Sequence, residues 1–345
     1  MLTLTTKDID RILRDYGISG TCAELTELQR YDYEENDPAA KEVRLIVKAV
    51  LDDGRRLVVR AKKEEDAPLE RIEDQSRFAA ALAAHGIETP RVYASDGRYA
   101  RWYGIGGYDV IVTVEDFADG QLQTVDLETA RKTGRLLARM HTIAEAGDLH
   151  VRGGVLFDPL RENDLFRFET IVEHRDALAA VDAELYESIV EEHERLLREV
   201  RVFEQAPRYA VQGDISDCNL YATARGEIGV FDYNWSGDNV LFFDAVMQAV
   251  FEARLMDYPA ELAGEQERPV LSAFLQGYDA ERPFTEEQER VFPYLYALIS
   301  AFWLGDQEWC RQSPGQTGGD LDREALRRGM EATLARTRYL PAMPV

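Results

Sequence analysis

The chain has 345 residues, which is long enough for two domains or lobes with large apolar cores. Its 64 acidic residues outnumber its 40 basic residues and give a formal net charge of −24 at pH 7. An acidic surface keeps a protein soluble and repels the phosphates of nucleic acids and anionic lipids. The charge therefore argues against nucleic-acid and membrane partners, whereas a cationic small molecule would be attracted.

Neither a run of 18 apolar residues nor an N-terminal signal segment is found in the sequence. The three cysteines, Cys22, Cys218 and Cys310, are far apart and odd in number, so they fit neither a disulfide framework nor a zinc site. We expect a cytoplasmic protein with reduced thiols. The oligomeric state is left open by the sequence.

The first third of the chain is rich in predicted strands. Alternating and β-branched residues predict strands over 22–33, 42–51, 55–61, 91–95, 100–105 and 108–117. A turn is expected at Asp52, Asp53 and Gly54. A helical pattern follows from residue 69 and ends at Gly86, a typical C-terminal cap. The patterns predict a small sheet with one helix for this part of the chain.

Helical patterns dominate from Val125 onward. Apolar and small residues from Leu127 to His141 recur at steps of three and four, which predicts one buried helix face. On that face His141 is interpreted as a hydrogen-bonded core residue. Further helices are expected over residues 162–176, 181–200, 239–256, 267–279, 285–304 and 321–337. The fold class is therefore α+β, with a small antiparallel-sheet lobe over residues 1–117 and a larger, mostly helical lobe over residues 118–345.

One short hairpin interrupts the helical patterns. The predicted register pairs Leu220 with Phe231, Tyr221 with Val230 and Thr223 with Ile228, and it leaves residues 224–227 as the turn. In this register Asn219 lies directly opposite Asp232, so that their oxygens converge as a hard divalent cation requires. Asp214 lies on the loop that leads into the first strand. Alternatively, Asp214 and Asn219 only form turns, and Asp232 caps a helix.

The order Gly213, Asp214, Asn219, hairpin, Asp232 resembles the His-Gly-Asp-x-x-x-x-Asn pattern of the aminoglycoside phosphotransferase and choline kinase families, small-molecule relatives of the protein kinases. The resemblance implies a two-lobed, protein-kinase-like fold and a phosphotransferase activity. It implies that Asp214 is the catalytic base and that Asn219 and Asp232 hold Mg²⁺. Asp244, at the start of a following helix, would anchor the catalytic loop.

Some positions depart from the family pattern. Gln212 stands where the family has histidine, and an amide can also fix the loop through hydrogen bonds. The lysine that holds nucleotide phosphates aligns with Arg60, and Lys62, on the same face of the strand, is the alternative. Both could instead be solvated charges at a strand end. The partner glutamate falls on Gln75, which is expected to point inward and to form a hydrogen bond with Arg60.

The hairpin over residues 30–44 contains no glycine where backbone amides would cover phosphates, which is unusual for an ATP-binding loop. In the connector, backbone groups from Glu115 to Phe117 would meet a purine. The phosphate acceptor should bind in the helical lobe. Candidate residues for its site are Tyr294, Trp303, Asp306, Glu308 and Trp309, although aromatic residues at helical spacing belong more often to the core.

From these features we predict an ATP-dependent kinase that uses Mg²⁺ and ATP, or another nucleoside triphosphate, as cofactors. It would phosphorylate a hydroxyl of a small polar, possibly cationic, metabolite or antibiotic. The alternative is a non-catalytic, kinase-like binding protein with an altered nucleotide site. A metal-dependent hydrolase is a third reading, although the local sequence offers no further ligands for a two-metal site.

Overall fold

The computed structural model describes residues 1–32, 42–65, 67–122, 124–161, 168–215, 217–255, 263–303, 308–311 and 323–345. Contacts divide the chain into two compact units. Unit 1 consists of Met1–Leu122, Leu149–Gly153 and Cys218–Ser236, and unit 2 contains the rest. The boundary expected after residue 117 stays a prediction. The contacts group the hairpin segment Cys218–Ser236 with the sheet, which its position in the sequence does not suggest.

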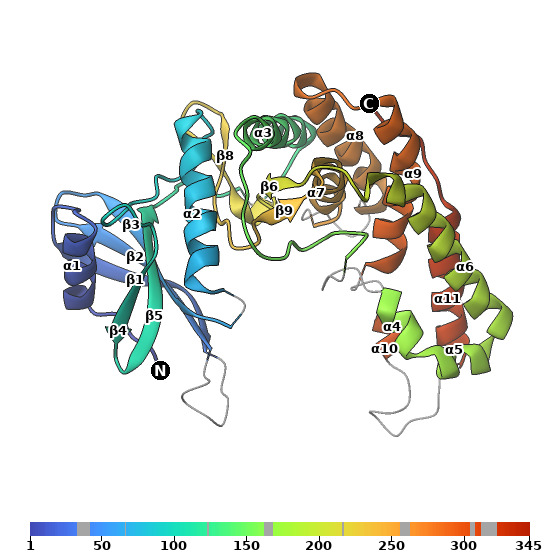
Figure 1. Cartoon of the computed structure of the whole chain (residues 1–345), viewed down its shortest axis with the longest axis horizontal. Coiled ribbons are helices and arrows are strands. Elements are labelled where there is room, and N and C mark those ends of the chain that lie inside the picture. The colour runs from blue at the N-terminus through green and yellow to red at the C-terminus, as the bar shows by residue number, and fades with distance from the viewer. Residues whose placement is uncertain are drawn as a thin grey trace. The chain divides into compact units, whose positions relative to one another are not determined.

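Unit 1 is built on a five-stranded sheet in the order β1-β2-β3-β5-β4, in which every pair is antiparallel (Figure 1). Its elements are α1 (Thr6–Asp15), β1 (Cys22–Asp32), β2 (Val43–Leu51), β3 (Arg56–Lys63), α2 (Leu69–Ala84), β4 (Arg101–Ile105), β5 (Tyr108–Asp116), β7 (Leu220–Ala222) and β8 (Ile228–Val230). The expected sheet with one following helix is confirmed. Residues 91–95, expected as a strand, form only isolated bridges such as Val92 with Glu115.

The two faces of this sheet are covered differently. Odd-numbered residues of β2 and β3 and even-numbered residues of β5 pack against α1 in one apolar core. The opposite face carries Arg60 and Lys62 of β3 and Glu115 of β5, because side chains alternate along a strand. Helix α1, which the sequence patterns did not reveal, begins with a capping box between Thr5 and Asp8. The face that carries Arg60 and Glu115 is therefore the one available for a site.

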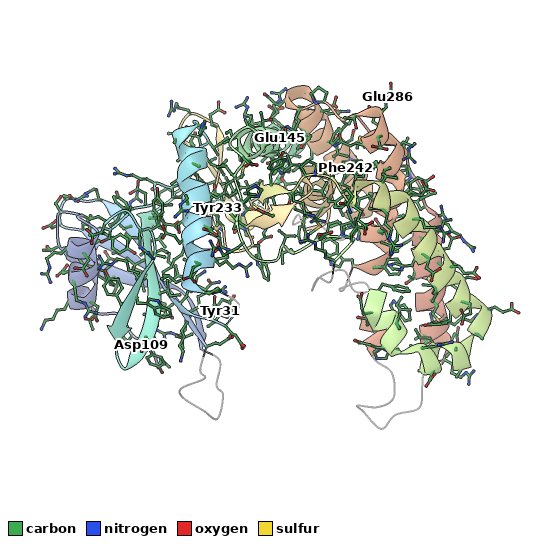
Figure 2. All side chains as sticks on the ribbon, viewed as in Figure 1. Tyr31, Asp109, Glu145, Tyr233, Phe242 and Glu286 are labelled. Atoms are coloured by element: carbon green, nitrogen blue, oxygen red, sulfur yellow. The ribbon has the colours of Figure 1, made fainter. Side chains whose placement is uncertain are left out.

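Unit 2 is mostly helical. It comprises α3 (Leu127–Ala146), α4 (Phe168–Glu173), α5 (Arg175–Val181), α6 (Ala183–Val200), β6 (Tyr209–Val211), β9 (Gly237–Asn239), α7 (Leu241–Leu255), α8 (Ala263–Glu281), α9 (Glu286–Phe302), α10 (Glu308–Arg311) and α11 (Arg323–Arg338). Its core includes Phe242, which lies among the helices (Figure 2). Among the described residues, none of the helices has the length and apolar composition needed to span a bilayer.

Helices α3 and α8 make close contact through glycines. A Cβ added to Gly134 would lie 2.0 Å from the carbonyl oxygen of Phe274, and one added to Gly277 would lie 2.0 Å from that of Arg131. Neither neighbouring atom can move without shifting a helix backbone. The two glycines therefore allow the helices to approach each other.

Gly134→Ala is expected to lower the free energy of unfolding by about 1–3 kcal/mol, the usual cost of overpacking. This clash must outweigh the roughly 1 kcal/mol by which alanine favours a helix over glycine. Chemical denaturation would measure the difference. Gly154→Ala is the control, because an added Cβ there meets nothing within 4 Å. Equal stability of the two variants would contradict the close approach.

Candidate functional site

The hairpin β7–β8 forms as predicted, but its register differs by one residue. Leu220 pairs with Val230 and Ala222 with Ile228, because the loop has three residues rather than four. The amide of Gly226 donates to the carbonyl of Thr223 at 2.9 Å, and Gly226 has a φ of +77°. A type I turn followed by a left-handed glycine is a common three-residue hairpin loop. The expected pairing of Asn219 directly opposite Asp232 is therefore wrong.

Asn219 is paired instead with Phe231, whose amide donates to the Asn219 carbonyl at 3.0 Å. Asp232 then leaves the strand with a φ of +61°, in the left-handed region that aspartate and asparagine tolerate. Its Oδ1 accepts the amide of Asn234 at 3.2 Å, which stabilises this turn. The turn brings Asp232 to a pocket that Asn219 also lines, so both predicted metal ligands share one site.

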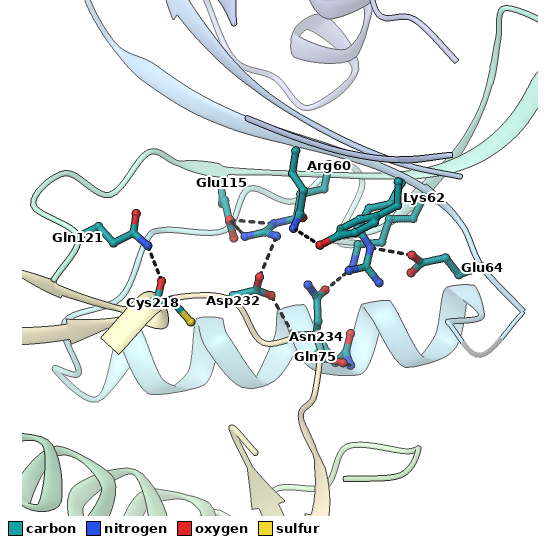
Figure 3. A network of polar contacts seen from close by, with 12 residues as sticks. Arg60, Lys62, Glu64, Gln75, Glu115, Gln121, Cys218, Asp232 and Asn234 are labelled. Atoms are coloured by element: carbon teal, nitrogen blue, oxygen red, sulfur yellow. Dashed lines mark hydrogen bonds and ion pairs between the residues drawn. The ribbon is translucent and has the colours of Figure 1, made fainter. Parts of the chain in front are cut away.

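Arg60 lies between two carboxylates (Figure 3). Its Nε and Nη2 donate to Glu115 Oε1 at 3.0 and 2.8 Å, and its Nη1 is 3.5 Å from Asp232 Oδ2. Burial alone would lower the pKa of Arg60, but Glu115 and Asp232 outweigh it and raise the pKa. Burial alone would raise the pKa of Asp232, but Arg60 and then Lys62 hold it below its usual value. Asp232 is therefore an anion held beside two cations.

Lys62 and Gln75 contact the segment after Asp232. The Lys62 ammonium donates to Asn234 Oδ1, and Gln75 Nε2 donates to the Asn234 carbonyl at 2.7 Å (Figure 3). Gln75 points inward as expected, but the expected hydrogen bond between Arg60 and Gln75 is wrong, since Arg60 pairs with Glu115. Asn234 and the Glu115 side chain are site residues that the sequence patterns missed.

Burial, followed by the neighbouring Arg60, lowers the pKa of Lys62 from 10.5 to about 8. The folded protein then binds fewer protons than the unfolded chain between about pH 8 and 10.5, so this group makes stability rise with pH in that window. From pH 8 to 9.5, the unfolding free energy of the wild type should gain about 1–2 kcal/mol relative to Lys62→Met. Denaturant titrations at several pH values test this. Parallel pH profiles of the two proteins would contradict it.

Arg60, Glu115, Asn219 and Asp232 all line one pocket of about 510 Å³ in unit 1. Its apolar walls include Ile46 and Val58 from the sheet and Phe231 from the hairpin, which suits a flat aromatic ring. Its polar lining includes Arg60, Asn219 and the acidic residues Glu115, Asp116, Asp119 and Asp232. A carboxylate and an amide oxygen fit a hard divalent cation, which takes six or more oxygen ligands and would need phosphate or water oxygens to complete the set. The pocket thus combines apolar side chains with charged ones.

The last residues of β5 and the connector that follows line the same pocket from Glu115 to Gln121. The amide of Phe117 donates to the carbonyl of Arg56 at 2.9 Å, and the amide of Asp116 donates to that of Arg91 at 2.9 Å. These two amides are already engaged, so purine binding by the backbone of Glu115 to Phe117 stays a prediction. The turn of the glycine-free hairpin, residues 33–41, lies outside the described residues.

Asp214 belongs to unit 2, where a buried network holds its loop. Gln212, which is fully buried, accepts the amide of Asp214 at 2.7 Å, as expected for an amide in place of histidine. The amide of Ile215 donates to Gln248 Oε1 at 2.8 Å, and Gln248 Nε2 donates to Asp244 at 3.1 Å. The loop backbone is therefore fixed by side chains at both Asp214 and Ile215.

The same network contains His141. Its Nε2 lies 3.0 Å from Asp244 Oδ2 and its Nδ1 lies 2.9 Å from the hydroxyl of Tyr278. The interpretation of His141 as a hydrogen-bonded core residue is confirmed. Asp244 links His141 on α3 to Gln248 on α7, and through Gln248 to the loop of Asp214.

The aromatic residues considered for the acceptor site make packing contacts in unit 2. The ring of Trp303 meets Phe251 edge-on at 5.0 Å, and Arg195 lies over the ring of Tyr294 at 5.8 Å. Trp309 packs against Gly329. These contacts favour the core interpretation. Asp306 and the side chain of Glu308 lie outside the described residues.

Comparisons with known proteins agree with the motif. A model of the phosphotransferase enzyme family matches residues 45–284. An amicoumacin kinase solved with AMP-PNP, Ca²⁺ and Ami is 16% identical with a TM-score of 0.57, and the match covers 96% of this chain and 94% of that one. An aminoglycoside phosphotransferase from Alicyclobacillus acidocaldarius is 13% identical with a TM-score of 0.55, over 91% and 92% of the two chains.

A spectinomycin phosphotransferase in complex with ADP and spectinomycin is 10% identical with a TM-score of 0.51, and the match covers 97% of this chain and 98% of that one. Comparison with curated protein sequences gives no match. At these low sequence identities the solved structures support the fold alone. The expected α+β, protein-kinase-like fold is confirmed.

Proposed function

The chain belongs to the phosphotransferase enzyme family, and from this membership we propose that it transfers the γ-phosphate of a nucleoside triphosphate to a hydroxyl of a small polar molecule. The observation that carries the proposal is the pocket in unit 1. Its lining combines apolar side chains that suit a base with Arg60, Asn219 and Asp232, which suit phosphates and a divalent cation. With a divalent cation held by Asp232 and Asn219, a pocket of this composition would suit a nucleotide.

Each group has a proposed role. Arg60, with Lys62 as the alternative, would contact nucleotide phosphates, and Asp232 and Asn219 would hold Mg²⁺. The cation would neutralise phosphate charge in the transferred group. Asp214 would accept or orient the proton of the attacking hydroxyl. Gln212 and Gln248 hold the backbone of its loop through hydrogen bonds. Phosphoryl transfer depends mainly on such alignment and charge neutralisation.

The proposed acceptor is a small polar molecule, possibly cationic. Two of the solved proteins with this fold are, by name, an amicoumacin kinase and a spectinomycin phosphotransferase. The net charge of −24 also favours a cationic acceptor, because it raises the local concentration of positive ligands. The protein would act in the cytoplasm, where Mg²⁺ and ATP are available.

A thermal-shift screen of ATP and GTP, with Mg²⁺ or with a chelator, tests nucleotide binding. A ligand that binds only the folded protein raises the melting temperature by mass action. We expect a clear rise with nucleotide and Mg²⁺ together, and a small rise with nucleotide and chelator. Equal shifts in the two conditions would contradict the metal site of Asn219 and Asp232.

One observation favours a second candidate, a binding protein without catalysis. In this structure the guanidinium of Arg60 is engaged by two carboxylates rather than held by a glutamate of α2, where the chain has Gln75. A nucleotide-dependent shift without any phosphate transfer would support this candidate.

A further inference from the structure

We propose that Glu115 is a positioning residue that acts through Arg60. Its carboxylate holds the guanidinium so that one end remains directed at the metal and phosphate region beside Asp232. This inference rests on the proposed function, because it assigns Arg60 to nucleotide phosphates. It adds a role for the Glu115 side chain, which is separate from any contact of the Glu115 backbone with a base.

The geometry of the sheet creates this pair. Val58 of β3 lies directly opposite Glu115 of β5, and Arg60 lies opposite Thr113. Arg60 and Glu115 are therefore diagonal neighbours on one face of two hydrogen-bonded strands, within reach of long side chains. Both side chains are largely buried, with exposures of 11% and 16%. A buried pair between two central strands has little freedom to rearrange.

Different nitrogens of the Arg60 guanidinium face the two carboxylates. Glu115 Oε1 accepts from Nε and Nη2, at 3.0 and 2.8 Å, and so occupies one edge of the planar group. Nη1 points toward Asp232, at the longer distance of 3.5 Å (Figure 3). The stronger contacts are thus made to Glu115, and the weaker contact is made to the proposed metal ligand.

Helix α2 does not supply this orientation. Gln75 donates to the carbonyl of Asn234 at 2.7 Å, and Glu73 accepts the amides of Tyr99 and Ala100 at 2.8 and 2.9 Å. Gln75 and Glu73 are thus both engaged by backbone groups elsewhere. Among the described residues, the carboxylates in ion pairs with Arg60 are those of Glu115 and Asp232. The orienting carboxylate therefore comes from strand β5.

Without Glu115, the attraction between Arg60 and Asp232 would no longer be opposed. The guanidinium would move closer to Asp232 and compete with the divalent cation for its oxygens. Both the phosphate contact and the metal site would be weakened. Loss of Glu115 should therefore lower the affinity for the metal–nucleotide complex, and it should do so only while Arg60 is present.

Calorimetric titration of Mg²⁺ with the non-hydrolysable analogue AMP-PNP tests this without any turnover. We expect Glu115→Ala to weaken binding at least about tenfold, since charge-assisted contacts are involved. Glu115→Gln keeps an acceptor of the same shape and should fall between Glu115→Ala and the wild type. Arg60→Ala and the double variant should bind equally, because removal of Arg60 leaves Glu115 nothing to position.

Asp53→Asn is the control, since it breaks another ion pair of unit 1, Arg55 Nε to Asp53 Oδ2 at 2.7 Å, and neither residue lines the pocket. This control should bind like the wild type. Unchanged binding in Glu115→Ala, or losses that add in the double variant, would overturn the positioning role while leaving the proposed function intact. A wild type that fails to bind AMP-PNP with Mg²⁺ would overturn both.

Discussion

Asp214→Asn is expected to reduce turnover by about 10² or more while metal–nucleotide affinity stays within a few-fold of the wild type. The substitution keeps the size of the side chain but removes its charge and its ability to accept a proton, and general-base catalysis usually contributes on this scale. The Asp214 amide and the neighbouring Ile215 amide are held by Gln212 and Gln248, so the loop should keep its shape. Steady-state release of ADP and calorimetric binding of AMP-PNP measure the two quantities.

An exposed aspartate of the same unit, Asp176 in the first turn of α5, supplies the control. Asp176→Asn should keep wild-type turnover. If Asp214→Asn retained full turnover with a bound acceptor, Asp214 would not be the base. If it lost nucleotide binding to the same extent as turnover, its role would be in binding rather than in the transfer step.

Asp232→Asn is expected to abolish the Mg²⁺-dependent part of nucleotide binding and, with it, turnover. The affinity measured with Mg²⁺ should fall to the level that the wild type shows with a chelator, because a neutral amide is a weaker ligand for a hard cation than a carboxylate. Asparagine is the most informative replacement at this position. It tolerates the φ of +61° and can still accept the Asn234 amide, so the turn should be preserved.

Asp96 offers a matched control, since it is an exposed aspartate of unit 1 that also has a left-handed φ, of +52°. Asp96→Asn also replaces a carboxylate by an amide at a residue with left-handed backbone conformation, but outside the pocket. This variant should bind nucleotide with Mg²⁺ like the wild type. If Asp232→Asn retained Mg²⁺-dependent nucleotide binding, the metal would have to be held by ligands other than Asp232.

The strands and helices with strong periodicity could be predicted from the sequence, and the strand pairing largely follows from their order. The hairpin illustrates the limit of this approach. The apolar pattern of residues 220–231 predicted two strands, but a three-residue and a four-residue turn differ by one position in register. The sequence was compatible with both loops, and the strand pairs together with the hydrogen bond between Gly226 and Thr223 distinguish them.

The candidate site likewise has residues that could be predicted from the sequence and residues that could not. The motif made Asp214, Asn219 and Asp232 candidates because their spacing is local, and local spacing is preserved whatever the tertiary structure. The partner of Arg60 is not local: Glu115 is 55 positions away and meets it through the register of β3 with β5. The predicted strand at residues 108–117 could have suggested this pair if its alignment with residues 55–61 had been known.

Transfer of a labelled γ-phosphate from ATP to a pool of small hydroxylated molecules, including cationic antibiotics and amino alcohols, tests the central claim most directly. The account predicts that the label appears in a small organic product only when Mg²⁺ is present, and that Asp214→Asn forms at most about one hundredth as much. Tight, Mg²⁺-dependent nucleotide binding without label in any organic product across this pool would contradict catalysis and identify a binding protein.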